Sequence, residues 1–250
     1  MPIQKSEAIL LRRQDLRETS LILTFYTKDF GKIKGVVKGA RGIRAACGGG
    51  AFEIFARDNV VFYERKRSEL FTVSHCDLLE FFGPVRSSLE KLAYASYLIE
   101  LVDAVTVLQD PHKDVFELLA HSLGLLCGED SPRRIARIFE IKLLGLLGLM
   151  PTLGRCSHCD KGLGGRPTFS LLHGGLLCDG CRQSDKTSQP VMPGTVKFIE
   201  HIRSSGFEKL MRVKVSSEVG KELERVLRKF LDYHVEHRFN TLRFLKEIEA

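Results

Sequence analysis

The sequence predicts an α+β protein in which an N-terminal β-barrel is followed by a helical bundle with a four-cysteine insertion. Five short strand-like runs fill the first 80 residues, and apolar residues recur at helical spacing after Pro84. Two Cys-x-x-Cys pairs lie in a turn-rich stretch that interrupts the helical part. We therefore expect a barrel domain over residues 1–80 and a helical domain over 81–250, with the insertion at about 152–190.

The composition excludes several classes of protein. With 250 residues and 44% hydrophobic side chains the chain can bury a core, which excludes disorder throughout. No run reaches the roughly 18 apolar residues that a membrane span needs. The first 25 residues contain Glu7, Asp15 and Glu18 and lack the apolar stretch of an export signal. We expect a soluble, cytoplasmic protein of net charge +7 that does not contact a membrane.

The predicted strands are runs rich in β-branched, aromatic and aliphatic residues, separated by polar or glycine-containing breaks. They cover residues 8–11, 21–27, 32–38, 59–63 and 70–75. Five short strands within about 80 residues suit a small barrel.

The densest basic cluster of the chain overlaps the third of these runs. Its six cations, with a single acidic residue among them, are Lys28, Lys32, Lys34, Lys38, Arg41 and Arg44. Because side chains alternate along a strand, the three lysines of the run share one exposed face, and Ile33 and Val37 face the core unless a bulge at Gly35 shifts this register. Such a cluster is typical of a surface that binds a polyanion, and an ordinary solvated surface is the alternative.

Residues 39–50, which overlap the end of this cluster, contain five glycines and two arginines. They contain neither of the glycine patterns that bind nucleotide phosphates, G-x-x-x-x-G-K-[ST] and G-x-G-x-x-G. We interpret the segment as a basic loop beside the polyanion surface rather than as a mononucleotide site.

Helical periodicity begins after Pro84 and returns after the insertion. Apolar stripes over 89–104, 118–126 and 132–147 predict three helices that pack as a bundle, the third starting at Pro132 and stopped by Pro151. Further helices are expected over 193–204 and 218–236. The last has an inward stripe of Leu223, Val226, Leu227, Phe230 and Leu231 and an opposite basic face of Lys221, Arg225, Arg228 and Lys229. That basic face is either solvated or a second contact for a polyanion.

The two cysteine pairs have the spacing of a metal site. Cys156 and Cys159 are separated from Cys178 and Cys181 by 18 residues. Two thiolates in one tight turn bind one side of a metal ion, and a second such turn completes a tetrahedral site. Four sulfur ligands favour Zn²⁺, with an iron–sulfur cluster as the next alternative. We expect one structural Zn²⁺ that folds a loop too poor in apolar residues to fold alone.

Other interpretations of the cysteines are weaker. Disulfides are disfavoured in a cytosolic chain, and a redox pair does not need duplication. A catalytic zinc keeps an open position, which four thiolates close, although His158 or His173 could replace one cysteine. The isolated residues Cys47, Cys76 and Cys127 fit small core or loop positions.

No motif supports catalysis. The chain lacks H-E-x-x-H and G-x-S-x-G. His234 and His237 are three residues apart on a basic amphipathic helix, which is typical of solvated or capping histidines. We therefore do not expect an enzyme.

Several segments distributed along the chain carry a resemblance to a known family. They are ETSLIL (18–23), FYTKDFGK (25–32), VVKGAR (36–41), FEIKLL (139–144), GLMP (148–151), RCSHC (155–159), YH (233–234) and RFL (243–245). With the order of barrel, bundle, cysteine insertion and final amphipathic helix, they resemble the RecO family of bacterial recombination mediators. The Gly- and Ala-rich stretch 43–50 departs from the family pattern.

The resemblance implies an OB-fold barrel and a non-catalytic role in DNA repair and recombination through the RecF pathway. Members of the family bind single- and double-stranded DNA and anneal complementary strands. They engage the acidic C-terminal tail of the single-strand binding protein and, with RecR, help to load RecA, with RecF as a further functional partner. The resemblance also implies a nucleoid-associated protein of the bacterial cytoplasm.

We predict DNA contacts from the basic cluster and from a second group in the next hairpin. The predicted contacts are Lys28, Lys32, Lys34, Lys38, Arg41, Arg44, Arg65, Lys66 and Arg67. Phe25, Tyr26 and Phe30 are candidates for stacking on bases, although a core position is favoured for Phe25. A protein adaptor that does not bind DNA is the competing hypothesis, and a zinc-dependent nucleic-acid enzyme is the weakest one.

Overall fold

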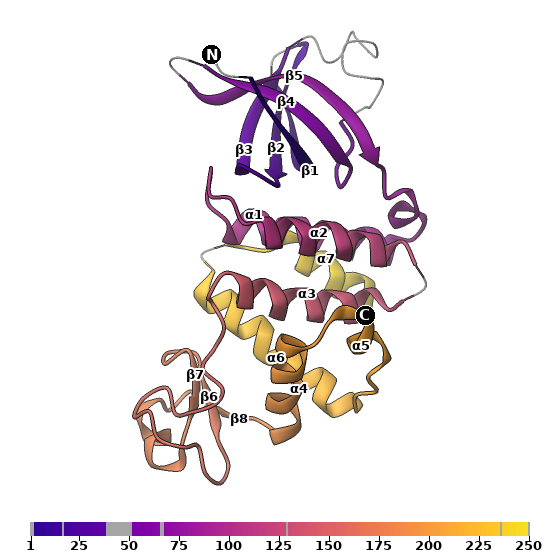
Figure 1. Ribbon diagram of the computed structural model, residues 1–250. Helices are drawn as coiled ribbons and strands as arrows, with labels where there is room; N and C mark the ends of the chain where they lie inside the picture. Colours follow the sequence, from indigo (N-terminus) through magenta and orange to yellow (C-terminus); the bar gives the residue numbers. More distant parts are fainter. Residues whose placement is uncertain are drawn as a thin grey trace. The chain divides into compact units, whose positions relative to one another are not determined.

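A computed structural model describes residues 3–16, 18–38, 52–65, 68–128, 130–235 and 237–249 (Figure 1). The chain forms two compact units. The barrel unit consists of Met1–Arg133 together with Phe239–Ala250, and the cysteine unit consists of Arg134–Arg238. We expected a domain boundary at residue 80. That boundary separates parts that fold on their own, which the division into compact units does not test, so it stays a prediction.

The five predicted strands are present and close into an OB-like barrel. They are β1 (Ile3–Leu16), β2 (Ser20–Thr27), β3 (Gly31–Val37), β4 (Arg57–Arg65) and β5 (Ser68–Glu80). Their order around the barrel is β1-β2-β3-β5-β4, and the seam between β3 and β5 is parallel. The predicted α+β class with an N-terminal barrel is therefore confirmed, with strands that extend beyond the predicted runs.

Gly35 allows the parallel seam to close. A Cβ atom at this position would lie 2.5 Å from Val73 Cγ2 on β5, closer than any side chain tolerates. β3 pairs with β2 without a register shift, so Gly35 carries no bulge. Ile33 and Val37 consequently face the barrel core as predicted, where they pack with Phe62 and Phe71.

Within the described residues, the barrel unit also contains four helical segments. They are the 3₁₀ helix η1 (Gly83–Ser87), α1 (Leu89–Val105), α2 (Lys113–Leu126) and α7 (Asn240–Glu249). α1 packs against α7, α2, η1 and β1, so residues on several of its sides are buried rather than one stripe (Figure 1). Ser88 begins α1, with its side chain accepting the N–H of Lys91.

The cysteine unit contains a small sheet among helices. α3 (Pro132–Leu146) begins at the predicted proline and leads into this unit. The other elements are β6 (Thr168–Ser170), β7 (Gly175–Leu177), η2 (Asp179–Ser184), β8 (Gln189–Pro190), α4 (Pro193–Ser204), α5 (Phe207–Arg212) and α6 (Ser217–His234). The five predicted inward residues of α6 are all buried. None of the helices within the described residues is long and apolar enough to cross a membrane.

Candidate metal centre and nucleic-acid interface

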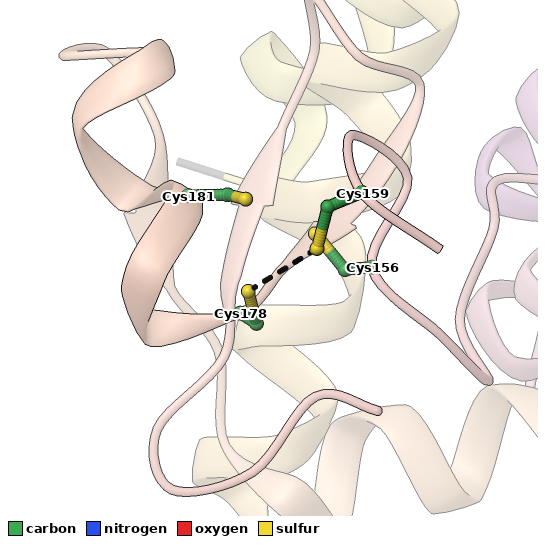
Figure 2. A group of neighbouring side chains, drawn as sticks. All are labelled: Cys156, Cys159, Cys178 and Cys181. Atoms are coloured by element: carbon green, nitrogen blue, oxygen red, sulfur yellow. Dashed lines mark hydrogen bonds between the residues drawn. The ribbon is translucent and has the colours of Figure 1, made fainter. Parts of the chain in front are cut away.

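The four cysteines of the two Cys-x-x-Cys pairs converge on one point (Figure 2). The sulfur atoms of Cys156, Cys159, Cys178 and Cys181 all lie within 4.8 Å of one another. Cys159 Sγ and Cys178 Sγ are 3.8 Å apart, far beyond the roughly 2.05 Å of a disulfide bond. Cys156 is buried and the other three are partly exposed, so the centre lies at the edge of its unit.

Backbone hydrogen bonds shape both turns. In the first, the Cys156 N–H donates to Lys161 O at 2.8 Å and the Asp160 N–H to Cys156 O at 2.9 Å. Asp160 takes the left-handed conformation, with a φ of 62°, which an aspartate tolerates better than most residues. In the second, the Cys181 N–H donates to Cys178 O at 3.0 Å, where η2 begins. Each turn thereby directs two sulfur atoms to the same side.

The electrostatics of the cluster favour a cation. Burial raises the pKa of Cys156, but hydrogen bonds from the backbone of Cys178, Cys159 and His158 outweigh it and lower that pKa to about 6. The neighbouring cysteine side chains, Cys159 first, instead raise the pKa of Cys181 to about 12. Four thiolates repel one another unless a metal ion lies between them, so this donor set fits a metal.

The charged and imidazole groups around the cluster interact with one another rather than with the sulfur atoms. Arg155 Nε lies 2.9 Å from Asp160 Oδ1, so its charge is already paired. The His158 and His173 rings pack edge to face at 4.9 Å and do not join the group of potential ligands within the described residues. The four sulfurs therefore form a closed donor set without a histidine.

Lys28 and Lys32 are held in ion pairs. Lys28 Nζ lies 2.6 Å from a carboxylate oxygen of Glu117, which raises the pKa of Lys28. Lys32 is only 8% exposed, and its Nζ lies 3.1 Å from Asp103 Oδ1. Lys32 points away from the core as alternation predicts, but the chain after α1 covers this face, with the Gln109 N–H donating to Lys32 O at 2.8 Å. The prediction that Lys32 is exposed is therefore wrong.

Lys34 and Lys38 are the two predicted contacts that are exposed on the barrel. Neither has an ion-pair partner among the residues that the structure describes. Arg65 ends β4, but its side chain lies outside the described residues. The remaining predicted contacts lie outside them altogether: Arg41, Arg44, Lys66 and Arg67.

The aromatic residues proposed for stacking are mostly interior. Phe25 and Tyr26 are fully buried, which confirms the core position favoured for Phe25 and makes the stacking prediction wrong for Tyr26. Phe25 belongs to the barrel core, and the Tyr26 hydroxyl donates to His112 O at 3.5 Å. Phe30 is partly buried and packs edge to face on Phe62 at 5.3 Å.

Family models match both parts of the chain. Residues 1–82 match the N-terminal model of recombination protein O, and residues 86–243 match its C-terminal model. The chain belongs to the RecO family of DNA repair proteins. The family membership agrees with the resemblance drawn from the short segments and covers the barrel and the cysteine cluster together.

Curated relatives agree over nearly the whole length. The DNA repair protein RecO of Pelotomaculum thermopropionicum is 36% identical over 245 residues, which cover 98% of this chain and 94% of the relative. The DNA repair protein RecO of Moorella thermoacetica is 34% identical over 246 residues, covering 98% of this chain and 91% of the relative.

Asp103 is the residue near the predicted RecO surface that the sequence did not reveal. It lies 71 residues from Lys32 and also binds Arg12, with its Oδ2 3.2 Å from Arg12 Nη2. Nothing in the sequence around an acidic residue near the end of a helix indicates that it pairs with two cations on barrel strands far away along the chain. Such pairing only becomes visible when the fold brings the residues together.

Proposed function

We propose that this protein is a non-catalytic DNA repair and recombination mediator that binds single- and double-stranded DNA and anneals complementary strands. In this proposal it acts with RecR to load RecA onto DNA coated by single-strand binding protein, whose acidic tail it contacts, and RecF is a functional partner. The family membership supports the role, and a cytoplasmic, nucleoid-associated location belongs to the same proposal.

The observation that carries the DNA-binding part is the exposed pair Lys34 and Lys38 on the barrel. Both ammonium groups lack ion-pair partners within the described part of the chain, so a phosphate can take that place. The chain continues from Lys38 into the basic segment that contains Arg41 and Arg44. Exposed cations without ion-pair partners on an OB-like barrel support a site that follows a nucleic-acid backbone.

The second part of the proposal is one structural Zn²⁺ on Cys156, Cys159, Cys178 and Cys181. Four sulfur donors in two tight turns suit this ion, and they leave no open position for a substrate or water. The closed donor set argues against the zinc-dependent enzyme. Bound Zn²⁺ would hold the two turns together and relieve the repulsion between the thiolates.

The test is a titration of a single-stranded oligonucleotide at several salt concentrations. Replacing Lys34 and Lys38 together by alanine should weaken binding and lower the slope of log K against log salt by about 1.4, at about 0.7 per phosphate contact. The matched control replaces the exposed lysines Lys197 and Lys246 by alanine and should leave the slope nearly unchanged. An unchanged slope in the Lys34 and Lys38 variant would remove the DNA site from this surface. Wild-type binding weaker than about 10⁻⁴ M would favour the protein adaptor instead.

A further inference from the structure

The positive charge of the protein is concentrated in the cysteine unit. Residues 134–238 contain 18 basic and 11 acidic side chains, a surplus of +7, whereas the barrel unit contains 20 of each sign. The unit with the predicted DNA-binding barrel is therefore neutral as a whole. A surplus of this size on a unit of about a hundred residues is typical of a surface that meets a polyanion.

A groove in the cysteine unit lies between the small sheet and α6. It has a volume of about 410 Å³, and Phe169 and Leu171 line it from the sheet side. Val226 and Tyr233 line it from α6. Phe169 and Val226 are buried and form an apolar floor, whereas Tyr233 is 53% exposed. An exposed aromatic ring beside an apolar floor is a place where a flat, partly polar group can stack.

Two cations border this groove. Arg225 and Lys229 are four residues apart on α6, which places them on the same side of the helix about 6 Å apart along its axis. Lys229 is exposed and has no ion-pair partner among the described residues, while Arg225 Nη2 lies 3.4 Å from Glu222 Oε1.

The one acidic residue that lines the groove is already neutralised. Asp232 Oδ2 lies 3.3 Å from Arg228 Nε, one helical turn earlier on α6. The Asp232–Arg228 pair therefore contributes little net charge, and Arg225 is balanced by Glu222 in the same way, so the unpaired Lys229 sets the field at the groove. That field is positive, so a negatively charged ligand is attracted.

We propose that this groove is a second binding site for single-stranded nucleic acid. A base stacks on Tyr233 over the apolar floor, and the flanking phosphates contact Lys229 and Arg225. An aromatic ring flanked by basic side chains is the arrangement by which proteins bind single strands without reading their sequence. This site is separate from the barrel surface of Lys34 and Lys38, so the two can be tested independently.

The test uses the full-length protein and an oligothymidylate that carries 5-iododeoxyuridine. Irradiation should crosslink the modified base to Tyr233, which mass spectrometry of the tryptic peptides identifies. Tyr233→Ala should remove this crosslink and weaken binding about tenfold, whereas Tyr233→Phe keeps the ring and the affinity. Lys229→Ala should lower the salt slope by about 0.7, and the control Lys197→Ala should not.

Three outcomes would overturn the proposal. Crosslinks confined to barrel peptides, with unchanged affinity in Tyr233→Ala and Lys229→Ala, would remove this site and leave the barrel proposal intact. Failure of the wild-type protein to bind the oligonucleotide would remove both. If Tyr233→Ala weakened binding of a fluorescent acidic, apolar peptide but not of the oligonucleotide, the groove would be a peptide-docking site instead.

Discussion

Asp58 places a carboxyl group at the interior of the barrel. The residue is 4% exposed, and its Oδ2 atom has no hydrogen-bond partner within the part of the chain that the structure describes. Burial raises the pKa of Asp58 to about 6, although a hydrogen bond with Cys76 acts in the opposite direction. A group whose pKa is higher in the folded than in the unfolded state stabilises the fold only while it is protonated.

The pH dependence of stability follows from this shift. The contribution of Asp58 is fully present below its unfolded pKa of 3.8 and is lost as the pH rises through about 6. At pH 7 the free energy of unfolding of Asp58→Asn should therefore exceed that of the wild type by on the order of 2 kcal/mol. At pH 3.5 the two free energies should be about equal. Urea unfolding at several pH values measures this, and Glu64→Gln on the same strand is the exposed control. An Asn variant that loses stability at pH 7 would contradict the assignment.

Lys32 shows what alternation along a strand can and cannot predict. The sequence predicted correctly that Ile33 and Val37 enter the core and that the lysines point outward. Whether an outward residue meets water depends on which segment packs over it, and Asp103 reaches Lys32 from another part of the chain. Periodicity within one strand contains no information about that covering segment.

At the scale of elements, a side chain from α1 caps the N-terminus of α7. The Glu100 carboxylate accepts the N–H groups of Asn240 and Thr241, at 3.0 and 3.1 Å, together with the Thr241 hydroxyl. It supplies both the missing acceptors and the negative charge that a helix N-terminus favours. Glu100 therefore ties the last helix to the barrel unit.

Glu100→Ala should loosen α7. Loss of the cap should cost about 1–2 kcal/mol of stability, because N–H groups of the first turn lose their acceptors. Hydrogen exchange should show faster exchange of the α7 amides, while the exposed control Glu247→Gln leaves them protected. Unchanged protection of α7 in Glu100→Ala would show that packing alone holds the helix.

We expect the folded structure of the two cysteine turns to require a bound metal ion. Cys159→Ser removes one of four sulfur donors, so the purified variant should contain less zinc than the one ion per chain that we expect for the wild type. Elemental analysis measures the content, and a chelator should lower the melting temperature of the wild type. Cys127→Ser, outside the cluster, is the matched control and should keep its zinc. A wild-type protein that is purified with iron instead would assign the site to another metal.

Elements with strong periodicity were predictable, and short ones were not. The five barrel strands and the buried stripe of α6 each contain enough alternating residues to reveal their period. β6, β7 and β8 have three residues or fewer, and α5 has six, which is too short for any period to appear. The cysteine spacing still located their region, because ligand geometry does not require a long element.

For the whole molecule, the distribution of charge differs from what the linear sequence indicated. The basic cluster at 28–44 indicated a positively charged barrel. Acidic residues elsewhere in the barrel unit balance its charge, so the unit as a whole is neutral. The division into units could not be derived from the sequence, since residues 239–250 rejoin a unit whose other residues end at 133. Only long-range packing, such as that of α7 on α1, determines which charges belong together.

This return of the chain has a consequence for biosynthesis. A ribosome releases residues 134–238 before it releases α7, so the cysteine unit can fold while the barrel unit still lacks a helix. α1 keeps an unpaired apolar side until α7 has been translated. The first unit to start folding is thus the last to be completed, and a nascent chain stalled within the cysteine unit would expose that side to chaperones.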